Sequence, residues 1–167
     1  PAGSFTTAAA MVAKVEKALA KYHDRKLKDT RIAIFGATGV VGYCTAVIAA
    51  EHGAKVTIVG HDGMERVKTL AASMKARFNV TVDPVDGSTE PHKKSILQEA
   101  QVVLAAAKAG VQVLSMTQLK AATALLVAAD VNAVPPAGIE GLKVNANGEP
   151  LNATNAVGIV ALSIGNI

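Results

Sequence analysis

The fold is decided by residues 32–42, which read Ile-Ala-Ile-Phe-Gly-Ala-Thr-Gly-Val-Val-Gly. A short apolar run suited to a buried strand is followed by glycines at positions 36, 39 and 42. Gly36 permits a sharp turn, Gly39 leaves space beside the backbone, and Gly42 lets the next helix pack closely. The stretch therefore predicts a strand, a tight turn and a helix whose first amides face an anion.

Outside this stretch, short apolar runs alternate with amphipathic segments. Strands are predicted at Arg31–Phe35, Lys55–Val59, Val80–Val82, Gln101–Ala105 and Ala124–Ala128, and helices at Ser4–Tyr22, Gly39–His52, Met64–Arg77 and Pro91–Ala100, with a short helix after Ser115. An edge strand is expected near Leu142–Val144, and the tail Val157–Ile164 is expected to form a last helix or strand. Strands and helices in alternation predict an α/β fold, a Rossmann-like doubly wound parallel sheet with helices on both faces.

Length and composition fit one main folding unit. The chain has 167 residues, of which 50% are apolar but only 3% aromatic, so its core must be built from Ala, Val, Ile and Leu. That palette is typical of a parallel sheet covered by helices. We divide the chain into a linking helix and connector at residues 1–28 and a dinucleotide-binding domain at residues 29–167.

Charge and cysteine usage exclude several function classes. The net charge is +4, but the basic residues are scattered and not interleaved with aromatic side chains, so no nucleic acid is expected as a partner. The single cysteine, Cys44, allows no intrachain disulfide, which fits a cytoplasmic location. No apolar run is long enough for a membrane span. The four histidines show no metal-ligand spacing, so no metal site is predicted.

The glycine turn predicts NAD or NADP as the cofactor. Its G-x-x-G-x-x-G spacing follows a strand and opens a helix, and Asp62 lies 20 residues after Gly42, close to the spacing of a ribose-binding acid. Asp62 favours NAD, whereas His61 and Arg66 soften that preference. The residues expected to contact the diphosphate and ribose are Gly36, Ala37, Thr38, Gly39, Val40, Val41, His61 and Asp62.

The rest of the predicted cleft lies after the fourth and fifth strands, because ligands of doubly wound sheets bind at the carboxyl ends of strands. There we expect Ala105, Ala106, Ala107 and Lys108, and then Asp130, Val131 and Asn132. Asp130 and Asn132 are the polar candidates for a role near the reacting atoms. No catalytic acid, base or nucleophile can be assigned from the sequence.

Five stretches carry a family resemblance that runs through nearly all of the chain. They are PAGSFTTAAAMVA (1–13), IFGATGVVGY (34–43), VGHDGMERV (59–67), DVNAVPPAGI (130–139) and VGIVALSIGN (157–166). With them the chain resembles the NAD(P)-dependent methylene-tetrahydromethanopterin dehydrogenases of one-carbon metabolism in methylotrophic bacteria. The stretches containing DVNAVPPAG and GHDG are more specific than the glycine motif.

The resemblance implies a reaction and a partner. Hydride transfer to the nicotinamide would oxidise a methylene bridge on a tetrahydromethanopterin-type pterin to the methenyl cation, in formaldehyde metabolism. Two nitrogens flank the reacting carbon and no proton need move, which fits the lack of an evident acid or base. The resemblance also implies a substrate-side domain upstream of residue 1 and further chain after residue 167. We expect a homo-oligomer.

Two other readings of the glycine turn are weighed against this one. A short-chain or extended reductase requires a Tyr-x-x-x-Lys pair, but neither Tyr22 nor Tyr43 has a lysine four residues later. An NAD(P)-binding regulatory or truncated module would bind the dinucleotide without turnover. The second reading stays open as the alternative.

Overall fold

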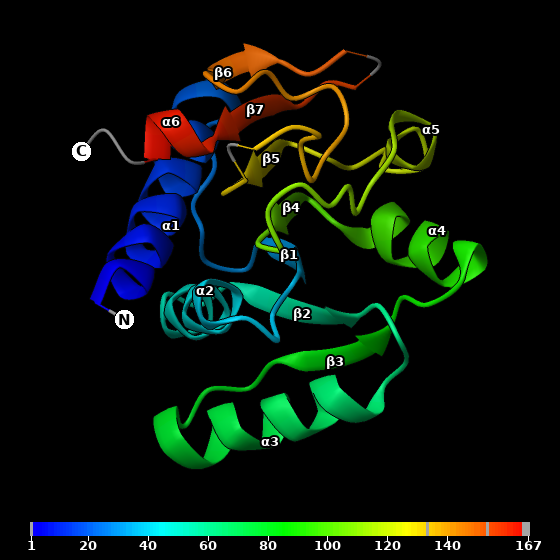
Figure 1. Cartoon of the computed structure of the whole chain (residues 1–167). Coiled ribbons are helices and arrows are strands. Elements are labelled where there is room, and N and C mark those ends of the chain that lie inside the picture. The colour runs from blue at the N-terminus through cyan, green and yellow to red at the C-terminus, as the bar shows by residue number, and fades with distance from the viewer. Residues whose placement is uncertain (1, 133, 153, 165–167) are drawn as a thin grey trace.

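The computed structural model describes residues 2–132, 134–152 and 154–164 (Figure 1). Pro1, Ala133, Ala153 and residues 165–167, some of which belong to the stretches that carry the family resemblance, lie outside these ranges. The strands are β1 (Arg31–Phe35), β2 (Lys55–Gly60), β3 (Asp83–Asp86), β4 (Val102–Ala105), β5 (Val127–Asp130), β6 (Asn147–Pro150) and β7 (Val157–Val160). The helices are α1 (Ala2–His23), α2 (Val40–Glu51), α3 (Glu65–Phe78), α4 (Glu90–Glu99), α5 (Met116–Leu119) and α6 (Ala161–Ile164).

The strands form one sheet in the order β3-β2-β1-β4-β5-β7-β6. All neighbouring pairs are parallel except β6 with β7. The chain moves outward from β1 through β2 to β3 and then returns to β4 on the other side of β1. This reversal is the point where doubly wound folds bind ligands. The predicted Rossmann-like fold is confirmed.

The sheet separates two hydrophobic cores, because successive side chains of a strand point to opposite faces. In β1, Ile32 and Ile34 pack with α1, α2 and α3, whereas Ala33 and Phe35 pack on the side of α4 and α5. Figure 1 shows α1 and α2 against one face of the sheet and α4 and α5 over the other. Burial on both faces explains why the central strands are continuous apolar runs.

Helix α1 belongs to the first of these cores. Its residues Met11, Val15 and Leu19 are fully buried at 0% exposure. At its C-terminal end, the ring Nε2 of His23 lies 2.8 Å from the carbonyl oxygen of Leu126, just before β5. The helix is therefore attached to the sheet along its length, by apolar contact and by this hydrogen bond.

Two of the parallel strands differ in position from the sequence prediction. The third strand is Asp83–Asp86 rather than Val80–Val82, although Val80 and Val82 are both buried. This strand lies at the sheet edge, where Pro84 costs no ladder hydrogen bond, so its polar sequence gave no strand signal. The fifth strand is Val127–Asp130 rather than Ala124–Ala128, because pairing begins where Val127 meets Val102.

The C-terminal part also departs from expectation. The edge strand is Asn147–Pro150 instead of Leu142–Val144, and it pairs antiparallel with β7. Leu142 is only 8% exposed and packs in the second core, so its apolar character reflects burial and not a ladder. The apolar tail contains both alternatives in succession, first strand β7 and then helix α6.

The glycine turn is held by close backbone contact. Gly36 has φ +89°, and a Cβ there would lie 2.5 Å from the backbone of Ala106 and Ala107. Gly42 faces the turn itself, since a Cβ at this position would overlap the carbonyl oxygen of Gly36 and approach Ala37 Cα to 2.8 Å. The turn, the start of α2 and the end of β4 therefore pack together only because these positions lack side chains.

We predict that Gly42→Ala lowers the free energy of unfolding by about 1–3 kcal/mol, because the added methyl forces α2 away from the turn. Denaturant unfolding measures the change. The matched control is Gly3→Ala in α1, where a Cβ meets nothing within 4 Å. That variant should be neutral or slightly stabilising, since alanine favours the helix. Equal stability of the Gly42→Ala variant and the wild type would contradict the packing described for this turn.

Candidate functional site

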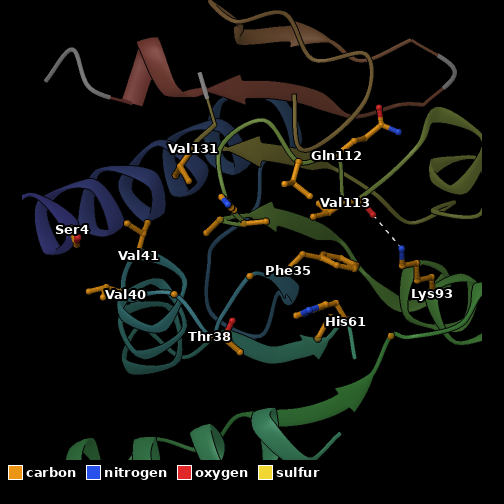
Figure 2. A pocket seen from close by; sticks show the side chains of 18 residues that line it. Ser4, Phe35, Thr38, Val40, Val41, His61, Lys93, Gln112, Val113 and Val131 are labelled. Atoms are coloured by element: carbon orange, nitrogen blue, oxygen red, sulfur yellow. Dashed lines mark hydrogen bonds between the residues drawn. The ribbon is translucent and has the colours of Figure 1, made fainter. Parts of the chain in front are cut away.

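A cleft of about 750 Å³ opens at the carboxyl ends of β1, β2, β4 and β5. Its size is within the range of cofactor and ligand sites. The described residues that line it are Ser4, Phe35, Gly36, Thr38, Gly39, Val40, Val41, Val59, His61, Gly87, Lys93, Ala106, Ala107, Lys108, Val111, Gln112, Val113 and Val131. Figure 2 shows these side chains converging from both sides of the sheet.

The glycine turn forms the middle of the cleft. Gly39 is the N-cap of α2, with φ −84° and ψ 163°, and it provides no side-chain hydrogen bond to the helix. The first-turn amides of α2 therefore keep their capacity to bind an anion, aided by the helix dipole. A Cβ at Gly39 would meet its nearest protein atom, the carbonyl oxygen of Gly36, at an ordinary 3.6 Å. The space beside Gly39 is open to a ligand.

After the end of β2, His61 lines the cleft, whereas Asp62 contacts its neighbours in sequence. The carboxylate of Asp62 lies 3.3 Å from the guanidinium of Arg66 and 3.9 Å from Nδ1 of His61. Its side chain is 47% exposed, and Asp62 is not among the described lining residues. The charged groups that do line the cleft are basic, namely Lys93, Lys108 and, when protonated, His61. This lining suits an anionic ligand.

Asp130 lies beneath the cleft and organises a loop. It is the last residue of β5 and is fully buried. Its carboxylate accepts hydrogen bonds from the amides of Asn132 at 2.8 Å, Gly138 at 2.6 Å and Ile139 at 3.2 Å. Burial raises the pKa of the Asp130 carboxyl, and the three amide hydrogen bonds oppose that rise. The side chain holds the two ends of loop 131–139 together.

Asn132 completes the hydrogen bonding of this loop. Its side-chain amide donates to the carbonyl oxygen of Pro136 at 3.2 Å, and its side-chain oxygen accepts from the amide of Val134 at 3.0 Å. The residue is 5% exposed. The carbonyl oxygen of Gly138 then accepts hydrogen bonds from the amides of Val113 and Leu114, at 2.7 and 3.0 Å. The loop therefore positions the segment that forms one wall of the cleft.

The structure brings most of the sequence-predicted site residues to this cleft. Those that line it are Gly36, Thr38, Gly39, Val40, Val41, His61, Ala106, Ala107, Lys108 and Val131. The others, which the described lining does not include, are Ala37, Asp62, Ala105, Asp130 and Asn132. Ala37 and Ala105 are buried directly behind the wall, at 1% and 0% exposure.

Sequence reasoning missed several lining residues. Ser4 comes from the first turn of α1, Lys93 from α4, and Gln112 and Val113 from the loop after β4. The apolar periodicity of a helix does not show which of its side chains reaches over a sheet edge. The loop after β4 carries no motif. Among these residues, only the position of Gln112 and Val113 shortly after a central strand offered a signal.

The described ranges were compared with the requirements of a metal site and of a membrane-spanning helix. No three His, Cys, Asp or Glu side chains there come together as metal ligands. No helix in the same part of the chain is long and apolar enough to cross a membrane.

Comparison with curated proteins gives two relatives, both from Methylorubrum extorquens. The chain is 52% identical over 167 residues to an NAD(P)-dependent methylenetetrahydromethanopterin dehydrogenase, covering 100% of the chain and 56% of that protein. The expected resemblance is confirmed. The chain is also 30% identical over 165 residues to the bifunctional protein MdtA, covering 99% of the chain and 55% of that protein. It thus spans about half the length of these relatives. A scan against family models finds no match.

Solved structures with the same fold are more distant in sequence. A transhydrogenase from Sinorhizobium meliloti superposes with a TM-score of 0.70 at 18% identity, covering 97% of this chain and 49% of that one. The shikimate 5-dehydrogenase of Listeria monocytogenes, solved with shikimate and NAD, gives a TM-score of 0.59 at 13% identity, covering 93% and 53%. At such identities the likeness concerns the fold alone.

We predict that the stability that Asp130 contributes falls as the pH rises. Its folded-state pKa is raised, so the folded protein holds the proton more tightly than the unfolded chain does. The contribution is complete at a pH below the pKa of Asp130 in the unfolded chain. It is lost as the pH rises through the pKa of Asp130 in the folded protein. Denaturant unfolding between pH 3.5 and 7, roughly the range of carboxyl titration, should show the difference between wild type and Asp130→Asn declining with pH.

The control for this titration is Asp86→Asn. Asp86 is only partly buried, with 32% of its side chain exposed, and its hydrogen bonds with Ser88 are the main cause that lowers its pKa. Its contribution is therefore present above the unfolded pKa and lost as the pH falls, the opposite slope. Parallel slopes for the two variants would show that burial does not govern Asp130.

Proposed function

We propose that this chain binds NAD or NADP in the cleft at the carboxyl edge of the sheet. The single observation that carries the proposal is the turn at Gly36–Val41, where an uncapped helix N-terminus faces an open, basic-lined cleft. Such a site is suited to a diphosphate. The relatives support the choice, since one is named as NAD(P)-dependent and one structural neighbour was solved with NAD.

The two halves of the dinucleotide then fall on opposite sides of the turn. The diphosphate takes the space beside Gly39, with Thr38, Val40 and Val41 around it. The adenosine lies toward His61 at the end of β2, and the nicotinamide lies toward Ala106, Ala107 and Lys108 after β4. In this proposal Ala37, Ala105, Asp130 and Asn132 support the site from behind.

A substitution at Gly39 tests the diphosphate position. Gly39→Val should fold with nearly unchanged stability, because its backbone is extended and a Cβ there has room within the protein. The side chain should nevertheless exclude the diphosphate and weaken NAD and NADP equally, by about tenfold or more. Calorimetric titration measures both affinities, and Gly39→Ala should give an intermediate loss. Unchanged affinity in the valine variant would place the diphosphate elsewhere.

We propose that Asp62 biases the site toward NAD without making it strict. Its carboxylate would accept the ribose 2′-hydroxyl and repel a 2′-phosphate. The guanidinium of Arg66 lies 3.3 Å from the Asp62 carboxylate, and Nδ1 of His61 lies 3.9 Å from it. The positive charge of Arg66, and that of His61 when its ring is protonated, offsets part of the repulsion. Acceptance of both cofactors follows from this balance.

Asp62→Asn should therefore raise the affinity for NADP relative to NAD by about fivefold, since one near-surface charge contact is worth about 1 kcal/mol. Glu65→Gln is the matched control, because Glu65 carries the same charge in the first turn of α3 and does not line the cleft. It should leave the ratio unchanged. A thousandfold preference of the wild type for NADP would refute the role given to Asp62.

The proposed reaction is oxidation of methylene-tetrahydromethanopterin to the methenyl form in one-carbon metabolism. When bound, the nicotinamide supplies the acceptor for a hydride. The protein's own task is to align the donor and acceptor carbons, with Val131 and the small residues after β4 shaping the wall and no acid or base required. The proposal rests on the 52% identity to a dehydrogenase of that name.

A spectrophotometric assay tests this reaction. Formation of reduced cofactor from this chain only when methylene-tetrahydromethanopterin is present supports the dehydrogenase. Tight cofactor binding without turnover supports the alternative, an NAD(P)-binding regulatory or truncated module. This alternative is included in the test because the chain spans only about half the length of its relatives. We further propose a homo-oligomer, a cytoplasmic location, and a cofactor-binding unit at residues 29–167 preceded by a linking helix.

A further inference from the structure

The carbonyl group of Val113 has a fixed direction. The amide of Leu114 donates to the carbonyl oxygen of Gly138 at 3.0 Å, and Gly138 is itself held by Asp130 at 2.6 Å. Because the peptide unit is planar and trans, the Val113 carbonyl points away from the Leu114 amide and so away from Gly138. Its oxygen is therefore a pre-positioned acceptor on the wall of the cleft.

Lys93, on α4, contacts this acceptor. Its Nζ donates to the carbonyl oxygen of Val113 at 3.4 Å, the dashed contact in Figure 2. This distance is longer than an ordinary hydrogen bond, so a ligand can replace the contact at little cost. The ammonium also has two further N–H donors. A donor and an acceptor thus stand side by side in the cleft.

The pair occupies the end of the cleft assigned to adenosine. Lys93 lies on α4, which follows β3, and the neighbouring lining residues His61 and Gly87 follow β2 and β3. A dinucleotide with its diphosphate at the glycine turn extends its adenosine toward this side of the sheet. The base is the part of the ligand that extends farthest from the diphosphate in that direction.

We propose that Lys93 and the Val113 carbonyl recognise the adenine base by its hydrogen-bonding edge. This inference rests on the dinucleotide binding proposed above. Adenine carries an amino donor at position 6 beside the acceptor N1 on its Watson–Crick edge. The amino group donates to the Val113 oxygen, and N1 accepts from Lys93 Nζ. Hypoxanthine has an oxygen at position 6 and an N–H at N1, which would set two acceptors against each other at Val113 and two donors against each other at Lys93.

The site therefore selects adenine over hypoxanthine. This selectivity is separate from the preference between NAD and NADP, which concerns the 2′ position of the ribose. Most of the cleft wall near the base is apolar, with Phe35, Val59 and Val113, and apolar contact does not distinguish adenine from hypoxanthine. In this proposal the polar pair of Lys93 and the Val113 carbonyl supplies that discrimination. Asp130 contributes as a positioning residue, since it holds the loop that fixes the acceptor.

The test compares NAD with nicotinamide hypoxanthine dinucleotide, which differs only in the base. Calorimetric titration of the wild-type chain should give about tenfold tighter binding of NAD, the ratio expected when one buried acceptor loses its donor. Lys93→Met leaves the Val113 oxygen in place, so it should lower the ratio without abolishing it, mainly by weakening NAD. Lys93→Arg retains donors and should keep most of the preference. Lys94→Met is the matched control, because Lys94 neighbours Lys93 on α4 but is exposed and does not line the cleft.

Three outcomes would overturn the inference or its basis. Equal binding of the two dinucleotides by the wild type overturns base recognition and leaves dinucleotide binding intact. An equal loss of both affinities in Lys93→Met, with the ratio preserved, shows that Lys93 contacts a part common to both ligands. Failure of the folded wild type to bind either dinucleotide refutes the proposed function itself.

Discussion

The contact between the first turn and the end of the fourth strand is the constraint on which the site depends. Gly36 lies so close to the backbone of Ala106 and Ala107 that no side chain fits between them, and Gly42 lies equally close to the turn. This packing brings the start of α2 up against the point where the winding of the sheet reverses. The uncapped amides of the helix and the small residues after β4 consequently face one cleft. A wider turn would separate them.

A second set of interactions shapes the opposite wall. Asp130 ends a buried strand with a carboxylate that three backbone amides of its own loop bind. Through Gly138, that loop sets the direction of the peptide between Val113 and Leu114. Three backbone amides partly compensate the cost of a charge on this buried carboxyl. Its position behind the wall makes the carboxylate part of the scaffold of the cleft.

The sequence predicted best those elements whose residues are both buried and hydrogen-bonded within the sheet or helix. Central strands such as β1 are apolar because both faces are covered, and the glycine turn has a spacing with a direct physical cause. Edge strands β3 and β6 were misplaced, because none of their residues, Asp-Pro-Val-Asp and Asn-Gly-Glu-Pro, is fully buried and they lack an apolar pattern. At the site, residues on the glycine motif were found from the sequence. Lys93 and Ser4 were not, because their approach to the cleft depends on how α4 and α1 pack.

Helix α1 has a consequence for how the chain can be divided. Its buried face fills the groove between the sheet and α2, and its first turn brings Ser4 to the cleft. A fragment that starts after the connector would leave that groove open to water and expose the apolar side chains that now pack against Met11, Val15 and Leu19. Such a fragment would be prone to self-association. The packing therefore makes the helix part of the same hydrophobic core as the sheet, even though the sheet begins only at Arg31.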